Sequence, residues 1–130
     1  MKLAMAVAIG GALGAAARYG TGFAFGPASA GSWPYATLLC NMLGSFLLGL
    51  LSGQAAVKPI GAFWKEGIGT GVLGGFTTFS AFSVETVEML REGHIFSAAT
   101  YAGFSMAGGI LFAAAGMHMT KRRAERKRDV

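Results

Sequence analysis

The chain has 130 residues, of which 53% are hydrophobic and 13% charged, and it carries a net charge of +5. With a mean hydropathy of +0.51, this composition excludes an ordinary soluble domain and is typical of a membrane protein. The sequence offers no nucleophile–base pair, metal-ligand cluster or phosphate-binding loop, and its only cysteine, Cys40, has no partner for an intrachain disulfide. We therefore expect a membrane protein that is not an enzyme and whose cysteine serves in packing.

Charged residues and helix breakers divide the chain into four apolar segments. Each is longer than the roughly 20 residues that a helix needs to cross the hydrocarbon core. The segments are residues 3–25, 35–57, 63–89 and 95–120. The stretches between them are too short to fold alone, so we expect one all-α transmembrane domain over residues 1–120, followed by a basic tail over residues 121–130.

The first segment contains Gly10 and Gly14, a spacing of small residues that lets another helix approach closely. Arg18 lies toward the far end of this segment. Because a charge within the membrane is costly, Arg18 either lines a positive vestibule that attracts anions or extends to the interface along its apolar stem. An alternative interpretation is a cleaved signal peptide, with Lys2 as its basic start and alanines 15–17 as the cleavage site, which would leave three spans.

The second segment begins after Trp33 and Pro34, which suit the membrane interface and the first turn of a helix. Asn41 and Ser45 follow one turn apart on the same helix face. An amide within the membrane needs a hydrogen-bond partner. Asn41 therefore either links two helices or faces a pore as a hydrogen-bond donor.

The third segment contains GIGTGVLGGFTTFSAFSVET over residues 67–86. Frequent glycines, followed by the β-branched pair Thr77 and Thr78, disfavour a continuous helix, so we expect one broken near its middle. The second half would begin near these threonines, with a hydroxyl as its cap, and would carry Phe79, Phe82 and Glu85 along one face. Because non-helical backbone within the membrane is tolerated only when it is buried or lines a cavity, the break is a candidate ion site. The alternative is a flexible, glycine-rich packing helix.

The fourth segment carries Tyr101 and Ser105 one turn apart, and these hydroxyls either form a polar track or bond to carbonyls of their own helix. The tail KRRAERKRDV holds six basic and two acidic residues. After a transmembrane span, we expect such a tail to keep the C-terminus in the cytoplasm and to meet anionic lipid, with no role in binding nucleic acid.

Taken together, these motifs resemble the Fluc (CrcB) family of fluoride channels. The resemblance covers essentially the whole chain through GGALGAAARY, TLLCNMLGSFLLG and GGFTTFSAFSVE, and the pattern GGxTTFSxF in the third segment is its most specific part. It implies a dual-topology fold, in which two four-helix subunits of opposite orientation form an antiparallel dimer with two fluoride pores. It also implies a passive fluoride exporter in the plasma or inner membrane of the cell.

The resemblance assigns roles to individual residues as well. A structural sodium ion at the dimer centre would be bound by the backbone carbonyls of Gly74 and Thr77, and Arg18 would lie in the vestibule. The residues that would line the fluoride pore are Asn41, Phe79, Phe82, Ser83 or Thr86, Glu85, Tyr101 and Ser105.

The chemistry of fluoride agrees with this assignment. Fluoride is small and strongly hydrated, so a pore must replace its water with donors such as the Asn41 amide and the serine and tyrosine hydroxyls. The ring edges of Phe79 and Phe82 carry partial positive charge and attract an anion weakly enough to release it. An alternative function is proton-coupled export of lipophilic cations, similar to that of the small multidrug resistance proteins. Glu85 would then replace the acid that those proteins carry in their first span.

The basic residues are distributed unevenly for a dual-topology protein. With four spans, Lys2, Lys58, Lys65 and the basic residues of the tail share one side of the membrane, against Arg91 on the other. The second subunit is therefore either another copy of this chain, which we favour because one complete set of pore residues is present, or an oppositely oriented relative.

Overall fold

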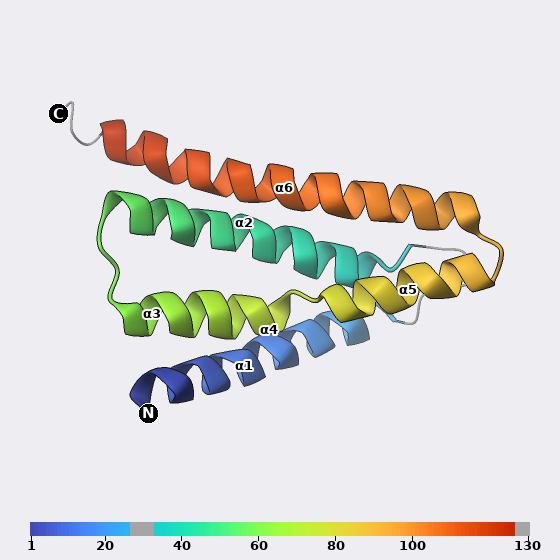
Figure 1. Cartoon of the computed structure of the whole chain (residues 1–130), viewed down its shortest axis with the longest axis horizontal. Helices are drawn as coiled ribbons and strands as arrows, with labels where there is room; N and C mark the ends of the chain where they lie inside the picture. Colours follow the sequence, from blue (N-terminus) through green and yellow to red (C-terminus); the bar gives the residue numbers. More distant parts are fainter. Residues whose placement is uncertain (27–32, 127–130) are drawn as a thin grey trace.

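The computed structural model describes residues 1–26 and 33–126, and this part of the chain is helical, without strands (Figure 1). The predicted loop between the first two spans therefore lies mostly outside the described residues. The elements are α1 (Lys2–Phe25), α2 (Tyr35–Val57), α3 (Ala62–Glu66), the π-helix η1 (Gly67–Leu73), α4 (Gly74–Phe76), α5 (Phe79–Arg91) and α6 (Ile95–Arg126).

The helices run side by side along one long direction (Figure 1). Within the described residues, α1, α2 and α6 are each long and apolar enough to cross a membrane. The third passage is shared between two shorter pieces, since α3, η1 and α4 follow one another directly and α5 continues after an interruption at Thr77 and Thr78. The prediction of four helical segments with a break in the third is confirmed, and the chain is a multi-pass membrane protein.

Glycines set the distance between α1 and the first half of the third passage. A Cβ added to Gly10 would meet the carbonyl oxygen of Gly67, and one added to Gly14 would meet that of Val72. From the other side, a Cβ on Gly75 would meet the carbonyl oxygen of Gly11. The close approach predicted for Gly10 and Gly14 is confirmed, and α1 is an integral part of the helix bundle.

A second glycine-rich contact joins α2 to α6. A Cβ added to Gly49 would meet the Ala113 carbonyl, and one added to Gly116 would meet the Phe46 carbonyl. Two helix pairs are thus held at backbone distance, which is how helices associate where lipid removes the hydrophobic driving force. Cys40 is fully buried within this arrangement, as expected for a packing residue.

The helix that contains the fourth span extends further than the sequence predicted. We expected it to end near residue 120, but α6 continues to Arg126, because the lysine, arginine, alanine and glutamate that follow are all good helix formers. The first part of the predicted tail is therefore a helical extension, and residues 127–130 lie outside the described residues. The start of α1, the end of α6 and the turn between α2 and α3 lie at the same end of the bundle (Figure 1), as the charge count assumed.

Candidate functional site

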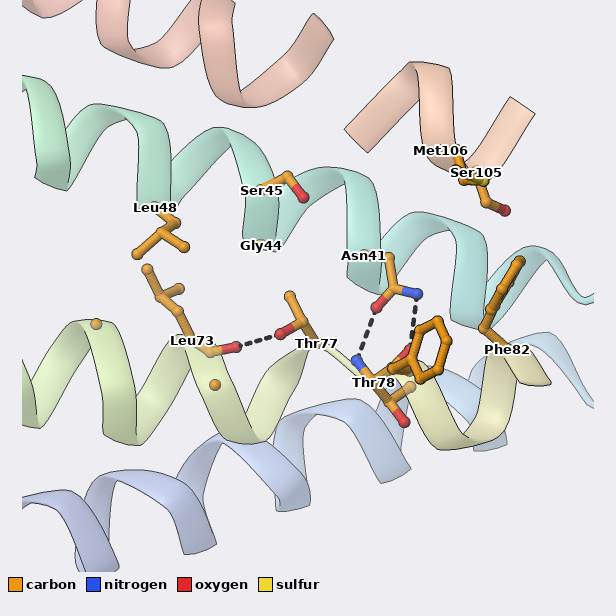
Figure 2. Close-up of a pocket in the computed structure, with 13 residues that line it drawn as sticks. Asn41, Gly44, Ser45, Leu48, Leu73, Thr77, Thr78, Phe82, Ser105 and Met106 are labelled. Carbon is orange, nitrogen blue, oxygen red and sulfur yellow. Dashed lines mark hydrogen bonds between the residues drawn. The ribbon is translucent and has the colours of Figure 1, made fainter. Parts of the chain in front are cut away.

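The break in the third passage is a short extended segment at Thr77 and Thr78. Thr77 has φ −78° and ψ 155°, and Thr78 has φ −149° and ψ 127°. The Thr78 hydroxyl accepts a hydrogen bond from the Ala81 amide at 3.2 Å and so caps α5. The Thr77 hydroxyl donates back to the Leu73 carbonyl at 2.9 Å (Figure 2). The prediction that a threonine hydroxyl caps the second half-helix is confirmed, with Thr78 as the cap.

Asn41 on α2 binds the exposed backbone of this break from the side. Its Nδ2 donates to the Thr78 carbonyl at 2.9 Å, and its Oδ1 accepts from the Thr78 amide at 2.8 Å (Figure 2). The Asn41 amide group thus pairs with both backbone groups of Thr78, which lies 37 positions further along the chain. Of the two roles that the sequence left open for Asn41, the interhelical link is present.

Arg18 on α1 reaches the same region from the opposite side. Its Nε donates to the carbonyl of Gly75 at 3.2 Å. This is a carbonyl close to the end of α4, where helical partners run out. Arg18 also lines a cavity of about 270 Å³ together with Tyr19, Phe23 and Thr37. Arg18 therefore both bonds α1 to α4 and lines the cavity between α1 and α2.

Two carbonyls at the break lose the partners that a continuous helix would give them. The Thr78 amide, which would close the bond to Gly74, donates to Asn41 instead. The Ala81 amide, which would close the bond to Thr77, donates to the Thr78 hydroxyl. Neither oxygen therefore receives the amide hydrogen that a continuous helix would supply. Gly74 and Thr77 also both line the central cavity described next.

A cavity of about 340 Å³ lies at the break, between α2, the third passage and α6. Figure 2 shows its wall. The lining includes Asn41, Ser45, Thr77, Phe79, Phe82 and Ser105. Within the described part of the chain, the Ser105 hydroxyl is a buried group without a hydrogen-bond partner. This hydroxyl is therefore free to form a hydrogen bond with a molecule or ion in the cavity.

The two phenylalanines differ in burial. Phe79 is 80% exposed, whereas Phe82 is half-buried and packs on Tyr101 with 5.4 Å between ring centroids. Their own centroids are 5.7 Å apart with the ring planes tilted by 38°. Both line the cavity, so the predicted shared face of α5 is confirmed for these two rings.

Glu85 joins three helices at one end of the site. Its Oε1 accepts from the Thr37 hydroxyl of α2 at 2.6 Å, and its Oε2 accepts from the Tyr101 hydroxyl of α6 at 2.8 Å. Tyr101 is fully buried and Thr37 is 8% exposed. Hydrogen bonds to a carboxylate oxygen are stronger than those between neutral groups, so this cluster fixes the rotation of α5 between its neighbours.

The chain matches the family model described as CrcB-like protein, Camphor Resistance (CrcB), over residues 5–117. This chain belongs to the CrcB family. Relatives named "Fluoride-specific ion channel FluC" occur in Hyphomonas neptunium, with 44% identity over 89% of this chain and 93% of the relative. Others occur in Leptospira interrogans, with 42% identity over 92% and 95%, and in Rhodospirillum centenum, with 44% identity over 87% and 92%.

Ser83 and Thr86, the other two polar residues that the CrcB resemblance predicted for the pore, both bond to carbonyls of α5. The Ser83 hydroxyl donates to the Phe79 carbonyl at 2.8 Å, and the Thr86 hydroxyl donates to the Phe82 carbonyl at 2.7 Å. These are bonds within the same helix, four residues back. Their protons are thus already used, whereas the lone pairs of both oxygens remain able to accept.

Sequence reasoning missed Thr37, which holds one oxygen of Glu85. Thr37, Asn41 and Ser45 are spaced one helical turn apart and form a single polar stripe on α2. Two of these were recognised as a pair on one face. Extending the same spacing by one turn toward the N-terminus would have found the third.

Proposed function

We propose that this CrcB chain forms a fluoride-selective channel through which fluoride leaves the cytoplasm passively. The observation that carries the proposal is the cavity at the helix break, where the rings of Phe79 and Phe82, the amide of Asn41 and the unpaired hydroxyl of Ser105 meet. The names of the relatives agree with this function. No energy coupling is needed, because fluoride enters as the weak acid HF, ionises inside, and is driven out by the membrane potential.

The residues of the cavity suit a small, strongly hydrated anion. The Asn41 NH₂ group has two protons and donates one to the Thr78 carbonyl, so the other can be donated to an ion. Ser105 supplies a hydroxyl, and the phenylalanine edges supply weak positive potential. None of these groups carries a full positive charge, and sites of modest strength allow an ion to leave as well as to enter.

The path would extend beyond the cavity along α5 and α6. Phe82 packs against the ring of Tyr101, and the Tyr101 hydroxyl donates a hydrogen bond to Glu85. The three side chains therefore form one continuous wall. Ser83 and Thr86 would contribute to this wall as donors if their hydroxyl protons turned from the Phe79 and Phe82 carbonyls to the ion. Arg18, at the hollow between α1 and α2, would raise the local concentration of anions at the entrance.

The functional unit would be an antiparallel dimer with two pores. Phe79 is 80% exposed in the single chain although it belongs to the cavity, and a second subunit would complete the wall on that side. Two subunits of opposite orientation would also bring two helix breaks together. The carbonyls of Gly74 and Thr77 from both breaks could then enclose one sodium ion, which would hold the interrupted helices in place.

Replacement of either phenylalanine tests the pore assignment. In liposomes loaded with fluoride, we expect rapid efflux from the wild-type protein, little chloride efflux, and loss of fluoride efflux in Phe79→Ile and in Phe82→Ile, because isoleucine has no polarised ring edge. Phe96→Ile is the matched control, since Phe96 is 82% exposed and lies at the start of α6. Undiminished flux in both test variants would refute the assignment, and proton-driven cation flux without fluoride flux would favour the multidrug-type exporter.

Removal of sodium tests the cation site. Protein purified and reconstituted in potassium salts is expected to lose fluoride flux and to recover it when sodium is restored, because the free carbonyls of Gly74 and Thr77 would otherwise destabilise the break. The measurement is efflux against sodium concentration at constant ionic strength. Equal flux at all sodium concentrations would exclude a required sodium ion without affecting the fluoride assignment.

Labelling of a cysteine placed after Val130 tests the dimer. A homodimer with dual topology requires both orientations, so we expect a membrane-impermeant thiol reagent to label this cysteine from both sides of the membrane in intact and permeabilised cells. The native Cys40 adds little background because it is fully buried. Labelling from one side alone would rule out the homodimer and would favour an oppositely oriented relative, as the uneven basic residues suggest.

A further inference from the structure

Two cavities lie between α2 and the end of α6, away from the ion site. The larger, of about 400 Å³, is lined by Leu50, Leu51, Gln54, Met119, Thr120 and Arg123. The smaller, of about 230 Å³, is lined by Ala56, Val57, Lys121, Ala124 and Glu125. Neither shares a lining residue with the cavity at the helix break.

The larger cavity, which we call the α2–α6 groove, is lined by both apolar and polar side chains. Leu50, Leu51 and Met119 supply the apolar part. The Thr120 hydroxyl is directed to backbone carbonyls, with Leu50 at 3.3 Å and Gly116 at 3.2 Å, so it ties the two helices together. Gln54 and Arg123, both exposed, are left as the polar groups that an occupant can reach.

The groove lies where lipid headgroups are. α6 has 32 residues, which at about 1.5 Å per residue gives about 48 Å, more than the roughly 30 Å of the hydrocarbon core. Its excess length includes the last turns, because Lys121, Arg122 and Arg123 are consecutive charges that are costly within the hydrocarbon. Gln54 is likewise in the last turn of α2, whereas Leu50 lies one turn closer to the membrane centre.

Charge distinguishes the two cavities. The smaller one has Glu125 beside Lys121, so its two charged groups oppose each other. The α2–α6 groove has Arg123 and no acid among its lining residues. A guanidinium binds a phosphate through two parallel N–H groups, which makes an exposed arginine above apolar side chains a good receptor for a phospholipid.

We propose that the α2–α6 groove binds one anionic phospholipid. The phosphate contacts Arg123 and Gln54, and an acyl chain packs against Leu50, Leu51 and Met119. The site is independent of the fluoride pathway, and it adds a specific lipid contact to the general attraction that a basic helix end has for anionic membranes.

Retention of lipid by single-charge variants tests the site. Native mass spectrometry would compare phosphatidylglycerol with phosphatidylcholine of identical chains, bound to wild type, Arg123→Gln, Arg122→Gln and Lys121→Gln. Wild type is expected to retain phosphatidylglycerol preferentially, and Arg123→Gln to reduce that retention about fivefold, because the hydrogen bonds between the guanidinium and the phosphate are lost. The two control variants remove the same charge from adjacent positions outside the groove and should change retention less than twofold.

Equal losses in all three variants, no loss in Arg123→Gln, or equal retention of both lipids by wild type would each overturn the proposal. Arg123→Lys keeps the charge but not the paired donors, and is expected to fall between wild type and Arg123→Gln. Soluble glycerol phosphate, which lacks acyl chains, should not displace the bound lipid. Elution and melting temperature of each variant in the same detergent report whether the fold is intact.

Discussion

Gly14→Ala is expected to separate α1 from the third passage and to destabilise the protein by about 3 kcal/mol, the upper end of the cost of overpacking a buried contact. The added methyl group would meet the carbonyl oxygen of Val72 and would come within 2.8 Å of the Phe76 amide nitrogen. Both are backbone atoms, so no side chain can rotate away. The whole helix must move, and the bond from Arg18 to Gly75 would be lengthened with it.

Gly20→Ala provides the matched control on the same helix. A Cβ at Gly20 meets no atom within 4 Å, and alanine is favoured over glycine in a helix by up to about 1 kcal/mol. Thermal unfolding in detergent, followed by circular dichroism and by size-exclusion chromatography, should therefore show a lower midpoint for Gly14→Ala and an unchanged or higher one for Gly20→Ala. Equal midpoints for the two variants would show that the α1 contact is more tolerant than its geometry indicates.

The division into four helical segments and the position of the break could both be predicted from the sequence. Hydropathy sets the spans, because an apolar run long enough to cross the bilayer has few other uses. The break followed from two threonines after a glycine pair, which combine low helix propensity with hydroxyls able to cap the next helix. The glycines before them were less informative, since Gly67–Leu73 remains coiled as a π-helix instead of unwinding.

Helical periodicity in the sequence could not predict which residues of distant segments contact each other. A helical wheel places Asn41 and Thr37 on one face of α2 but does not fix how α2 is rotated relative to the third passage. That rotation depends on where Gly44 lets α2 approach Phe76 and Thr77 of the third passage. The hydrogen-bond partners of Asn41 and Glu85 could therefore be identified only from the packed structure.

Asn41→Ala is expected to have the second large effect, because it removes a side chain that satisfies two backbone groups at once. The Thr78 amide and carbonyl, bonded at 2.8 and 2.9 Å in the intact site, would both lose their partner within a half-buried region. Each buried backbone group without a partner costs about 1–3 kcal/mol, and part of this is recovered if water or a lipid-facing rearrangement replaces the amide. A net loss of about 2–4 kcal/mol is expected.

The two losses expected from Asn41→Ala can be separated by measuring stability and flux on the same preparation. Destabilisation of the break should lower the melting midpoint, and loss of the free amide proton in the cavity should lower fluoride efflux in those molecules that remain folded. Ser52→Ala, at an exposed position on the same helix, is the control for removal of a polar group from α2 and should leave both quantities unchanged. If Asn41→Ala melts like wild type yet conducts poorly, the amide acts on the ion alone. If it melts early but conducts normally per folded molecule, the amide acts only on Thr78, and the pore donor must be sought at Ser105.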